Sequence, residues 1–454
     1  MNTPPPSLQA DDMLLAPEWL LLDSGLAQGM AVRVRAGRFE DVGPLAELRL
    51  RHPTSLPVEL PRRLLMPGFI DTHHHLTQSF GKSLAFGEPS EIFRRIWVPL
   101  EGSLDERGLY LAAKLAALEA LRGGFTTACD AGTRSELGVD TVAQAVTDAG
   151  LRCVLGLICN DAGVTDTQPL IEAAERHLAR WDDNGLVHPS LAISIPEAAT
   201  DGMLARVAAL CAQSGAPFQT HVNEHTASLE RSIIARGLRP IEVLEHAGAL
   251  GPHALLAHAT LLTPREMRVL RDTGSAVSYC PVASIWKGNA VAQAGMLSEL
   301  GVPVGLGSDG TRGDAFRLMD AAETCQRFAY GLAADDFSCG GGWQWLEAAT
   351  AGGARAAGLG ERTGRIAPGL AADFLLLDLD VPELLPSWDL AWELVRLANR
   401  DQIEAVYVAG KMRLWRGWPL DWDARALMQE VAAIARDTLA RAPIVKLHPV
   451  RAVR

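Results

Sequence analysis

The chain has little lysine and an excess of acidic residues. Only five of its 42 basic residues are lysines, and none lies between Lys114 and Lys287. The 454 residues carry 54 acidic side chains, which gives a formal net charge of −12. No segment gathers the dense positive charge that binds nucleic-acid phosphates or an anionic membrane. We therefore expect neither nucleic acid nor membrane as a partner.

Long apolar runs are also absent. No stretch of about eighteen apolar residues is present, so the sequence predicts no membrane-spanning helix. Residues 1–12 have neither the basic start nor the apolar core of a secretory signal peptide. The seven cysteines are dispersed, without a C-x-x-C pair. We expect them to be reduced core residues of a cytoplasmic protein.

The composition and the order of patterns predict an α/β fold. Hydrophobic residues make up 48% of the chain and charged residues 21%, which is typical of a protein with a large buried core. Short β-rich runs alternate with helical patterns, which indicates βα units and a parallel sheet. The eight runs are Leu64–His75, Phe125–Gly132, Arg152–Asn160, Leu191–Pro196, Pro217–His225, Ala254–Leu261, Ala276–Pro281 and Val302–Asp309. Eight such units in about 250 residues predict a (β/α)₈ TIM barrel.

The segments outside the barrel have a different pattern. Residues 10–62 and 364–420 are short, alternating and rich in turns. They predict a small composite β-sandwich domain built from both chain ends, around a barrel of residues 63–363. Residues 421–442 have helical spacing, so residues 421–454 are expected to form a C-terminal helical tail with an irregular end. Within the barrel, Thr263-Pro264-Arg265-Glu266 is a capping box that marks the start of a helix.

The strongest local signal is Asp71-Thr72-His73-His74-His75 at the end of the first barrel run. Side chains two residues apart on a strand share one face, so His73 and His75 point together and His74 points away. Two imidazoles at the C-terminal mouth of a barrel suit zinc or iron(II). The alternative is a polar strand end with solvated histidines.

Polar residues at three further strand ends weigh against that alternative. His221 and Glu224 end the fifth run, His258 ends the sixth and Asp309 ends the eighth. The carboxyl ends of barrel strands are where barrel active sites are built. A buried polar side chain there needs a partner, which a shared metal supplies.

These motifs resemble the amidohydrolase superfamily, in the branch of cytosine deaminase, guanine deaminase and the s-triazine hydrolases. The matching segments are PGFIDTHHHLTQS, GFTTACD, QTHVNE, LLAH, YCP, GLGSDG, ATAGGARAAGLGERTGRIAPGLAADF and VAGK. They extend over nearly the whole chain. Within the branch, THHHLTQS is most similar to 8-oxoguanine and isoxanthopterin deaminases, which carry a glutamine at the place of Gln78.

The resemblance implies one divalent metal ion, with zinc as the first choice and iron(II) as the second. The implied ligands are His73, His75, His221 and Asp309. Relatives with two metals use a carboxylated lysine on a mid-barrel strand, and this chain has no lysine there. Members of the family form homo-oligomers, so we expect one here.

The same resemblance implies three catalytic residues, Glu224, His258 and Asp309. A divalent ion makes hydroxide available near neutral pH because it lowers the pKa of water. Asp309 would accept the proton as an electron-poor ring carbon is attacked. Glu224 would protonate the ring nitrogen and His258 would stabilise the oxyanion, before ammonia leaves.

Residues that contact a substrate are harder to identify. Gln78 is the candidate, because its amide can pair with a carbonyl and an adjacent N–H of a planar heterocycle; the alternative is a solvated loop glutamine. Trp97 lies in the segment 80–100, which predicts either an apolar lid or ordinary packing. Trp286 and Arg312 follow the seventh and eighth barrel runs, and whether they line the mouth of the barrel is left open.

The sequence thus predicts a metal-dependent hydrolytic deaminase with a small-molecule substrate. The expected substrate is a nitrogen-rich aromatic heterocycle such as an oxidised purine, a pterin, a pyrimidine or an s-triazine. One alternative is the same attack with another leaving group, as in a chlorohydrolase, an N-alkylaminohydrolase or a formimino hydrolase. A second is a non-catalytic scaffold relative, which the complete set of ligands argues against.

Overall fold

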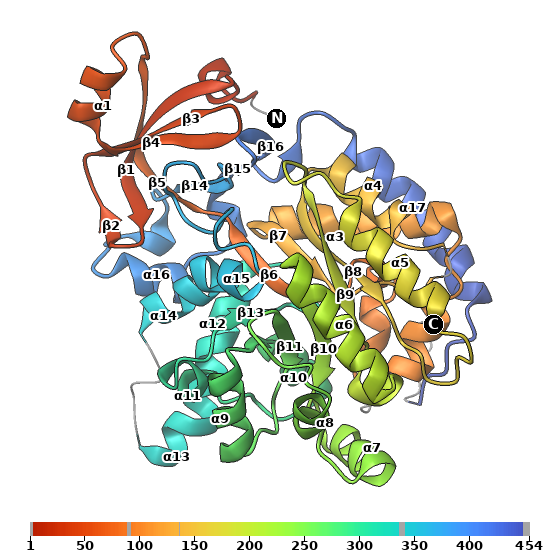
Figure 1. Cartoon of the computed structure of the whole chain (residues 1–454). Helices are drawn as coiled ribbons and strands as arrows, with labels where there is room; N and C mark the ends of the chain where they lie inside the picture. Colours follow the sequence, from red (N-terminus) through yellow and green to blue (C-terminus); the bar gives the residue numbers. More distant parts are fainter. Residues whose placement is uncertain (1–2, 89–91, 136, 336–340, 448–454) are drawn as a thin grey trace, which may run out of the picture.

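The computed structural model describes the chain except for residues 1–2, 89–91, 136, 336–340 and 448–454. It has two parts, a barrel surrounded by helices and a separate sheet at one side (Figure 1). The N-terminal strands and the strands near the C-terminus lie together in the separate sheet. Both parts of the predicted fold are therefore confirmed.

Eight parallel strands form the barrel and follow one another in sequence order. They are β6 Phe69–His74, β7 Phe125–Asp130, β8 Arg152–Ile158, β9 Val187–Ala192, β10 Phe218–Val222, β11 Ala254–His258, β12 Ala276–Tyr279 and β13 Val304–Leu306. The first and last strands meet just beyond β13, where His74 forms a parallel bridge with Asp309. The backbone N–H of Asp309 donates to the carbonyl oxygen of His73 at 2.8 Å. This hydrogen bond closes the barrel.

Two strands differ from the predicted runs. Residues 64–67 belong to β5 (Pro57–Pro67), which pairs with strands of the separate sheet and not with the barrel. The fourth barrel strand begins at Val187 rather than at Leu191. Its first half contains His188, Pro189 and Ser190, so it lacks the apolar run of a buried strand. Ser190 is fully buried, and its hydroxyl is satisfied because it accepts a hydrogen bond from the side-chain N–H of Gln219 at 2.7 Å.

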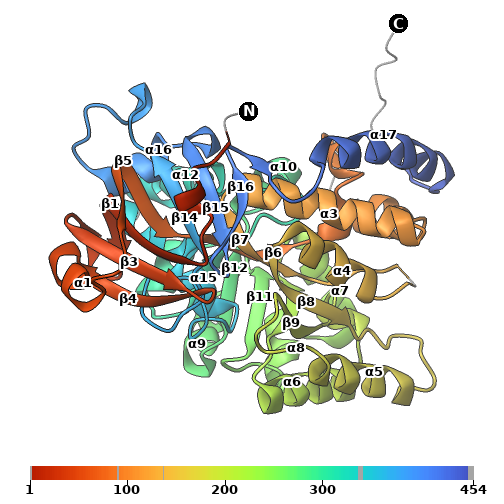
Figure 2. The same ribbon diagram turned by 90° about the horizontal axis from the view of Figure 1, so that it is seen from above.

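Helices cover the outside of the barrel (Figures 1 and 2). Those after the first five strands are α2 Val98–Glu101, α3 Glu106–Arg122, α4 Asp140–Ala149, α5 Gln168–Ala179, α6 Asp201–Ser214, α7 Thr226–Arg236 and α8 Pro240–His246. Later ones are α9 Pro264–Thr273, α10 Pro281–Lys287, α11 Ala294–Glu299, α12 Ala315–Gln326, α13 Leu332–Ala334, α14 Gly342–Ala349 and α15 Ala351–Ala356. The predicted capping box starts α9, where the Thr263 hydroxyl accepts from the backbone N–H of Glu266 at 3.2 Å. None of the described helices is both long and apolar enough to cross a bilayer.

The second part is a nine-stranded mixed sheet from both chain ends. Its strands are β1 Asp12–Leu22, β2 Gly25–Ala27, β3 Met30–Arg35, β4 Arg38–Pro44, β5, β14 Phe374–Asp378, β15 Ile403–Val408, β16 Lys411–Trp415 and β17 Trp418–Pro419. The rings of Phe39 on β4 and Phe374 on β14 lie 5.9 Å apart, although three strands separate β4 from β14 in the sheet. The sheet therefore folds over on itself and packs around its own apolar core, as a sandwich does.

The remaining elements lie around these two parts. Helix α1 (Leu45–Arg51) connects β4 to β5, and α16 (Leu390–Arg396) lies between β14 and β15. The tail forms α17 (Ala424–Arg441), which runs beside α3 on the outside of the barrel (Figure 2); residues 448–454 of the predicted tail lie outside the described residues. Six cysteines are free and buried, and Cys339 also lies outside the described residues.

A buried ion pair links the barrel to the composite sheet. Arg152 at the start of β8 donates two hydrogen bonds to Asp373, at 2.7 and 3.1 Å. Asp373 also accepts from the backbone N–H of Ala409 at 2.6 Å and from the Thr363 hydroxyl at 2.8 Å. Arg152 reaches the ring nitrogen Nε2 of His188 at 3.1 Å, so this imidazole must be neutral to accept. Burial first, and then Arg152, lowers the pKa of His188 to about 4.

The low pKa of His188 predicts a loss of stability in acid. The imidazole is neutral in the folded chain but ionises near its ordinary value of 6.5 in the unfolded chain, so its contribution is present above 6.5 and is lost as the pH falls. Between about pH 7.5 and about pH 5 we expect this one group to lower the free energy of unfolding by about 2 kcal/mol. Urea unfolding at both pH values should show that His188→Gln loses less unfolding free energy on acidification than the unchanged chain, by about 2 kcal/mol. An exposed control, His246→Gln, should keep the full loss, and equal sensitivity in all three proteins would contradict the assignment.

Candidate active site

The first barrel strand contributes two imidazoles that face the same way. The rings of His73 and His75 lie 4.9 Å apart, nearly perpendicular to each other. His74 turns away, and its Nδ1 lies 2.7 Å from the hydroxyl of Ser308. Ser308 is held in turn by Asp71, which accepts from its backbone N–H at 2.9 Å. The alternation along the strand thus separates two histidines of the pocket from one that supports the barrel wall.

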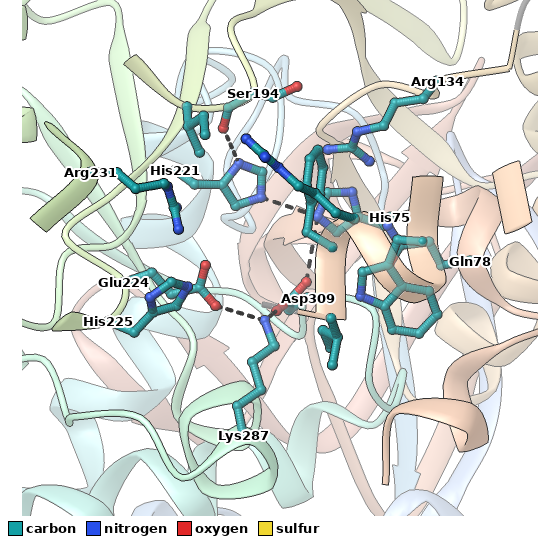
Figure 3. A pocket seen from close by; sticks show the side chains of 15 residues that line it. His75, Gln78, Arg134, Ser194, His221, Glu224, His225, Arg231, Lys287 and Asp309 are labelled. Atoms are coloured by element: carbon teal, nitrogen blue, oxygen red, sulfur yellow. Dashed lines mark hydrogen bonds and ion pairs between the residues drawn. The ribbon is translucent and has the colours of Figure 1, made fainter. Parts of the chain in front are cut away.

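His221 at the end of β10 brings a third imidazole to the same point (Figure 3). Its Nε2 lies 3.2 Å from Nε2 of His75, and the rings of His73 and His221 are 4.7 Å apart. The other ring nitrogen, Nδ1, donates to the carbonyl oxygen of Ser194 at 2.6 Å. This hydrogen bond fixes the tautomer so that Nε2 of His221 presents a lone pair.

The three imidazoles are suited to bind a divalent cation. One ring nitrogen from each of His73, His75 and His221 lies within 4.8 Å of the other two. Burial lowers the pKa of all three rings, that of His221 to about 4, so they are neutral near pH 7 as metal ligation requires. Nε2 of His73 is buried and has no hydrogen-bond partner among the described residues. A buried lone pair without a donor is what a bound metal would satisfy.

Asp309 lies beside these rings. It follows β13, and its Oδ1 lies 3.5 Å from Nε2 of His75 and 3.9 Å from Nε2 of His73. Burial raises the pKa of this carboxyl, but Lys287 and the neighbouring imidazoles outweigh burial and hold the pKa well below its usual value. Asp309 is therefore an ionised carboxylate at the edge of the histidine cluster.

Glu224 and His258 also lie close to Asp309, and Glu224 shares a cation with it. The ammonium of Lys287 is 2.8 Å from Oε1 of Glu224 and 2.8 Å from Oδ2 of Asp309 (Figure 3). Nε2 of His258 is 3.8 Å from Oε2 of Glu224. Burial raises the pKa of Glu224, yet Lys287 and His258 more than offset this, so the group is ionised.

Backbone strain is concentrated at these strand ends. Asn223, His258 and Asp309 have φ values of 49°, 71° and 56°, in the left-handed region that costs a non-glycine residue on the order of 1–2 kcal/mol. The hydroxyl of Thr260 donates to the carbonyl oxygens of Asn223 and Glu224, at 2.7 and 2.8 Å. These contacts hold the backbone in the conformation that turns Glu224 into the pocket.

The sequence did not point to Lys287 as a site residue. It ends α10, and its side chain is only 18% exposed. The signal that was available is the scarcity of lysine, together with the position of Lys287 shortly after the seventh barrel strand. Three arginines that line the same pocket, Arg94, Arg134 and Arg231, were missed as well.

Gln78 lines the pocket and is not a solvated loop residue. Its side chain is 2% exposed, and its Oε1 has no hydrogen-bond partner among the described residues. Its Nε2 lies 3.5 Å from Oε1 of Glu101, which is fully buried. Gln78 is thus held at the wall of the pocket by a buried carboxylate.

The segment before α2 also lines the pocket. Residues Phe93–Trp97 form one π-helical turn, a distortion that recurs at functional sites, and both aromatic side chains reach the cavity. Residues 89–91 of the expected lid lie outside the described residues. Trp286 packs against Phe86, with ring centres 4.7 Å apart. Neither Trp286 nor Arg312 is among the described residues that line the cavity.

Comparisons with known proteins agree with this geometry. The model of the amidohydrolase family matches residues 64–413, which is more than half of the chain. The chain belongs to the amidohydrolase family. The predicted superfamily and the predicted class of enzyme, a hydrolase, are confirmed by this match.

Individual relatives cover this amidohydrolase almost from end to end. The 5-methylthioadenosine/S-adenosylhomocysteine deaminase of Syntrophobacter fumaroxidans is 28% identical over 411 residues, 89% of this chain and 93% of the relative. An adenosine deaminase from Xanthomonas campestris with bound zinc superposes with a TM-score of 0.85, at 26% identity, over 96% of this chain and 99% of that one. A variant of the atrazine chlorohydrolase of Arthrobacter aurescens, in complex with zinc, superposes with a TM-score of 0.83 over 93% of this chain and 100% of that one. At 19% identity it shows that the fold is shared.

The histidine cluster predicts that the amidohydrolase binds a metal through His73. Protein purified after expression with added zinc or iron should contain about one metal ion per chain by plasma mass spectrometry. His73→Ala should lose most of that metal, because one of three neutral nitrogen ligands is removed. His246→Ala, at an exposed histidine on α8, is the matched control and should keep it. Metal-free protein, or His73→Ala with unchanged metal content, would contradict the site.

Proposed function

We propose that this amidohydrolase is a metal-dependent hydrolytic deaminase of a small amino-substituted nitrogen heterocycle. The observation that supports this most is the grouping of neutral imidazoles with two ionised carboxylates in one pocket. Three imidazole nitrogens lie within 4.8 Å of one another, and Asp309 and Glu224 flank them on either side of Lys287. Metal ligands and proton carriers are thus side by side, as hydrolytic attack on a ring carbon requires.

In this proposal His73, His75, His221 and Asp309 hold one divalent ion. When bound, the ion supplies a nucleophile at neutral pH because it lowers the pKa of water. Zinc is our first choice and iron(II) the second, because imidazole nitrogen suits both and the Xanthomonas structure contains zinc. The same four residues thus fix the place at which the substrate carbon must lie.

Proton transfer is assigned to the carboxylates beside Lys287. Asp309 accepts the proton of the attacking water. Glu224 is ionised in the structure, so it must first take up a proton before it can protonate the ring nitrogen. The ammonium of Lys287 lies 2.8 Å from each of the two carboxylates, so a proton has only a short distance to travel from Asp309 to Glu224. His258 is placed to donate a hydrogen bond to the oxyanion that develops.

The substrate class follows from the pocket and the relatives together. Gln78 and the aromatic side chains Phe93 and Trp97 suit a flat ring with polar edges. Two of the relatives named above are deaminases of adenosine compounds, so we add aminopurine nucleosides to the oxidised purines, pterins, pyrimidines and s-triazines. The homo-oligomer and the cytoplasmic location stay predictions.

Glu224→Gln should separate proton transfer from metal binding. The amide has nearly the same shape but carries no titratable proton, so kcat should fall by roughly 10²- to 10⁴-fold, while the metal content stays unchanged. Glu230→Gln, at an exposed position on α7, is the matched control and should have full activity. Near-native turnover by metal-loaded Glu224→Gln would sink the assigned role.

A screen for released ammonia tests the reaction itself. Metal-loaded protein should release ammonia from at least one of 8-oxoguanine, isoxanthopterin, pterin, guanine, isocytosine, cytosine, ammeline, melamine, adenosine and 5-methylthioadenosine. Asp309→Ala should abolish it, because a ligand and a proton acceptor are lost together. Release of chloride or an alkylamine from substituted s-triazines, without any ammonia, would favour a chlorohydrolase or N-alkylaminohydrolase. Metal-loaded protein that is inactive on all of these would favour an acyclic formimino compound.

A further inference from the structure

The wall of the pocket carries more positive charge than the metal chemistry needs. The described lining residues include four cations, Arg94, Arg134, Arg231 and Lys287, but only two acids, Glu224 and Asp309. Both acids contact Lys287, at 2.8 Å each. The three guanidinium groups are further cations of the lining, in a chain whose net charge is −12, and two of them are paired with acids outside the lining.

Arg134 is the arginine whose placement is most constrained. It follows β7, and its side chain is 12% exposed. Its Nη1 donates to Oε2 of the fully buried Glu101 at 3.0 Å, and its guanidinium lies over the ring of Phe93, 4.3 Å from the ring centre. Its Nε is buried and has no hydrogen-bond partner among the described residues. A guanidinium fixed on two sides thus has a donor left over in the pocket.

Gln78 supplies an acceptor on the same wall. Glu101 accepts from Arg134 with one oxygen, and its other oxygen lies 3.5 Å from Nε2 of Gln78. The hydroxyl of Thr77 donates to that second oxygen at 2.7 Å. Oε1 of Gln78 is buried without a partner, so the wall presents one unused donor and one unused acceptor. Unpaired buried polar atoms are costly, and a ligand that pairs with both would relieve that cost.

The other two arginines widen the positive surface. Arg231 on α7 lies on the opposite side of His221 and His75 from Arg134 (Figure 3). It is paired with Glu197, whose Oε1 is 3.4 Å from its Nε. Arg94 lines the pocket from the π-helical turn and is exposed. An anion that enters the mouth therefore meets guanidinium groups from separate elements.

We infer that the substrate of this site carries an oxyanion, which Arg134 binds at the wall that Gln78 and Glu101 complete. The oxyanion is a carboxylate attached to the ring or an ionised oxygen of the ring itself. A planar guanidinium matches both, because its N–H groups lie in one plane and point at adjacent oxygens. The inference rests on the proposed deaminase function and narrows its substrate class to anionic aminoheterocycles.

The negative charge on the rest of the protein limits the size of the anion. A polyanion such as a nucleic acid would extend beyond the pocket over an acidic protein, where it is repelled. A small single anion stays inside the pocket, where the cations of the lining are nearest to it. The arrangement thus selects a small charged heterocycle over both neutral analogues and polymers.

Matched pairs of substrates test this selection. Each pair contains the same leaving amine with and without the anion: pterin-6-carboxylate with pterin, cytosine-5-carboxylate with cytosine, and ammelide with ammeline. The first two pairs report on a carboxylate and the third on an ionised ring oxygen. We expect at least one charged member to exceed its partner in kcat/KM by roughly 10- to 100-fold, the range of a charge-assisted hydrogen bond. Added salt should reduce that ratio.

Substitutions then locate the selection at Arg134. In Arg134→Gln the ratio of kcat/KM for the charged over the uncharged member should fall by roughly 10- to 100-fold, and Arg134→Lys should restore part of it. Arg176→Gln, at an exposed arginine on α5, is the control and should keep the ratio. Circular dichroism and metal content verify that each variant is folded. If Arg134→Gln does not fold, Arg94→Gln at the exposed edge of the pocket should lower the ratio in the same direction.

The outcomes separate this inference from the proposed function. Ammonia released equally well from charged and uncharged members, with no effect of salt, would overturn the inference and leave the deaminase intact. An unchanged ratio in folded Arg134→Gln would also overturn it. Absence of ammonia from every compound tested would overturn the proposed function and the inference together.

Discussion

The hydrogen bond from the backbone of Asp309 to the carbonyl oxygen of His73 is the contact on which the active site depends. It joins the last strand of the barrel to the first, and it fixes the register between them. A shift of one residue at this junction would turn His73 out of the pocket and His74 into it, because side chains alternate along a strand. Closure of the barrel and assembly of the histidine cluster with Asp309 are therefore one event. Residues 236 positions apart in the chain become neighbours only when all eight strands are in place.

Burial of charge is the second constraint, and it explains where the cations lie. Several buried acids of this structure have an arginine or lysine beside them: Asp373 has Arg152, Glu101 has Arg134, and Glu224 and Asp309 share Lys287. An unpaired carboxylate in these places would shift its pKa and become neutral. Pairing keeps Glu224 and Asp309 ionised, which proton transfer requires. The same physical rule thus serves the link between domains, the wall of the pocket and its chemistry.

The predictability of each feature depends on how local its cause is. The paired orientation of His73 and His75 follows from the two-residue period of a strand, and the start of α9 follows from a capping box within four residues. By contrast, the predicted start of β9 lies too far along the chain, because the buried polar side chains in its first half are satisfied by residues of another strand. Residues 64–67 were assigned to the wrong sheet because the apolar pattern of β5 continues into β6. Lys287 and Arg134 could not be found from spacing. Their roles arise from contacts with residues far away in the sequence, which no local period records.

The site divides into two parts with different physical tasks. In the proposed reaction, the imidazoles and the carboxylates beside Lys287 would perform chemistry that is the same for any electron-poor ring carbon, so they cannot by themselves decide between substrates. The wall of Gln78, Arg134 and Glu101 lies apart from that chemistry and contains two further unpaired polar atoms, Oε1 of Gln78 and Nε of Arg134. A site with buried unpaired donors and acceptors discriminates strongly against ligands that cannot match them, whereas an apolar pocket discriminates weakly. We therefore assign selection among heterocycles to this wall, where the guanidinium of Arg134 keeps an unpaired N–H that an anion would accept.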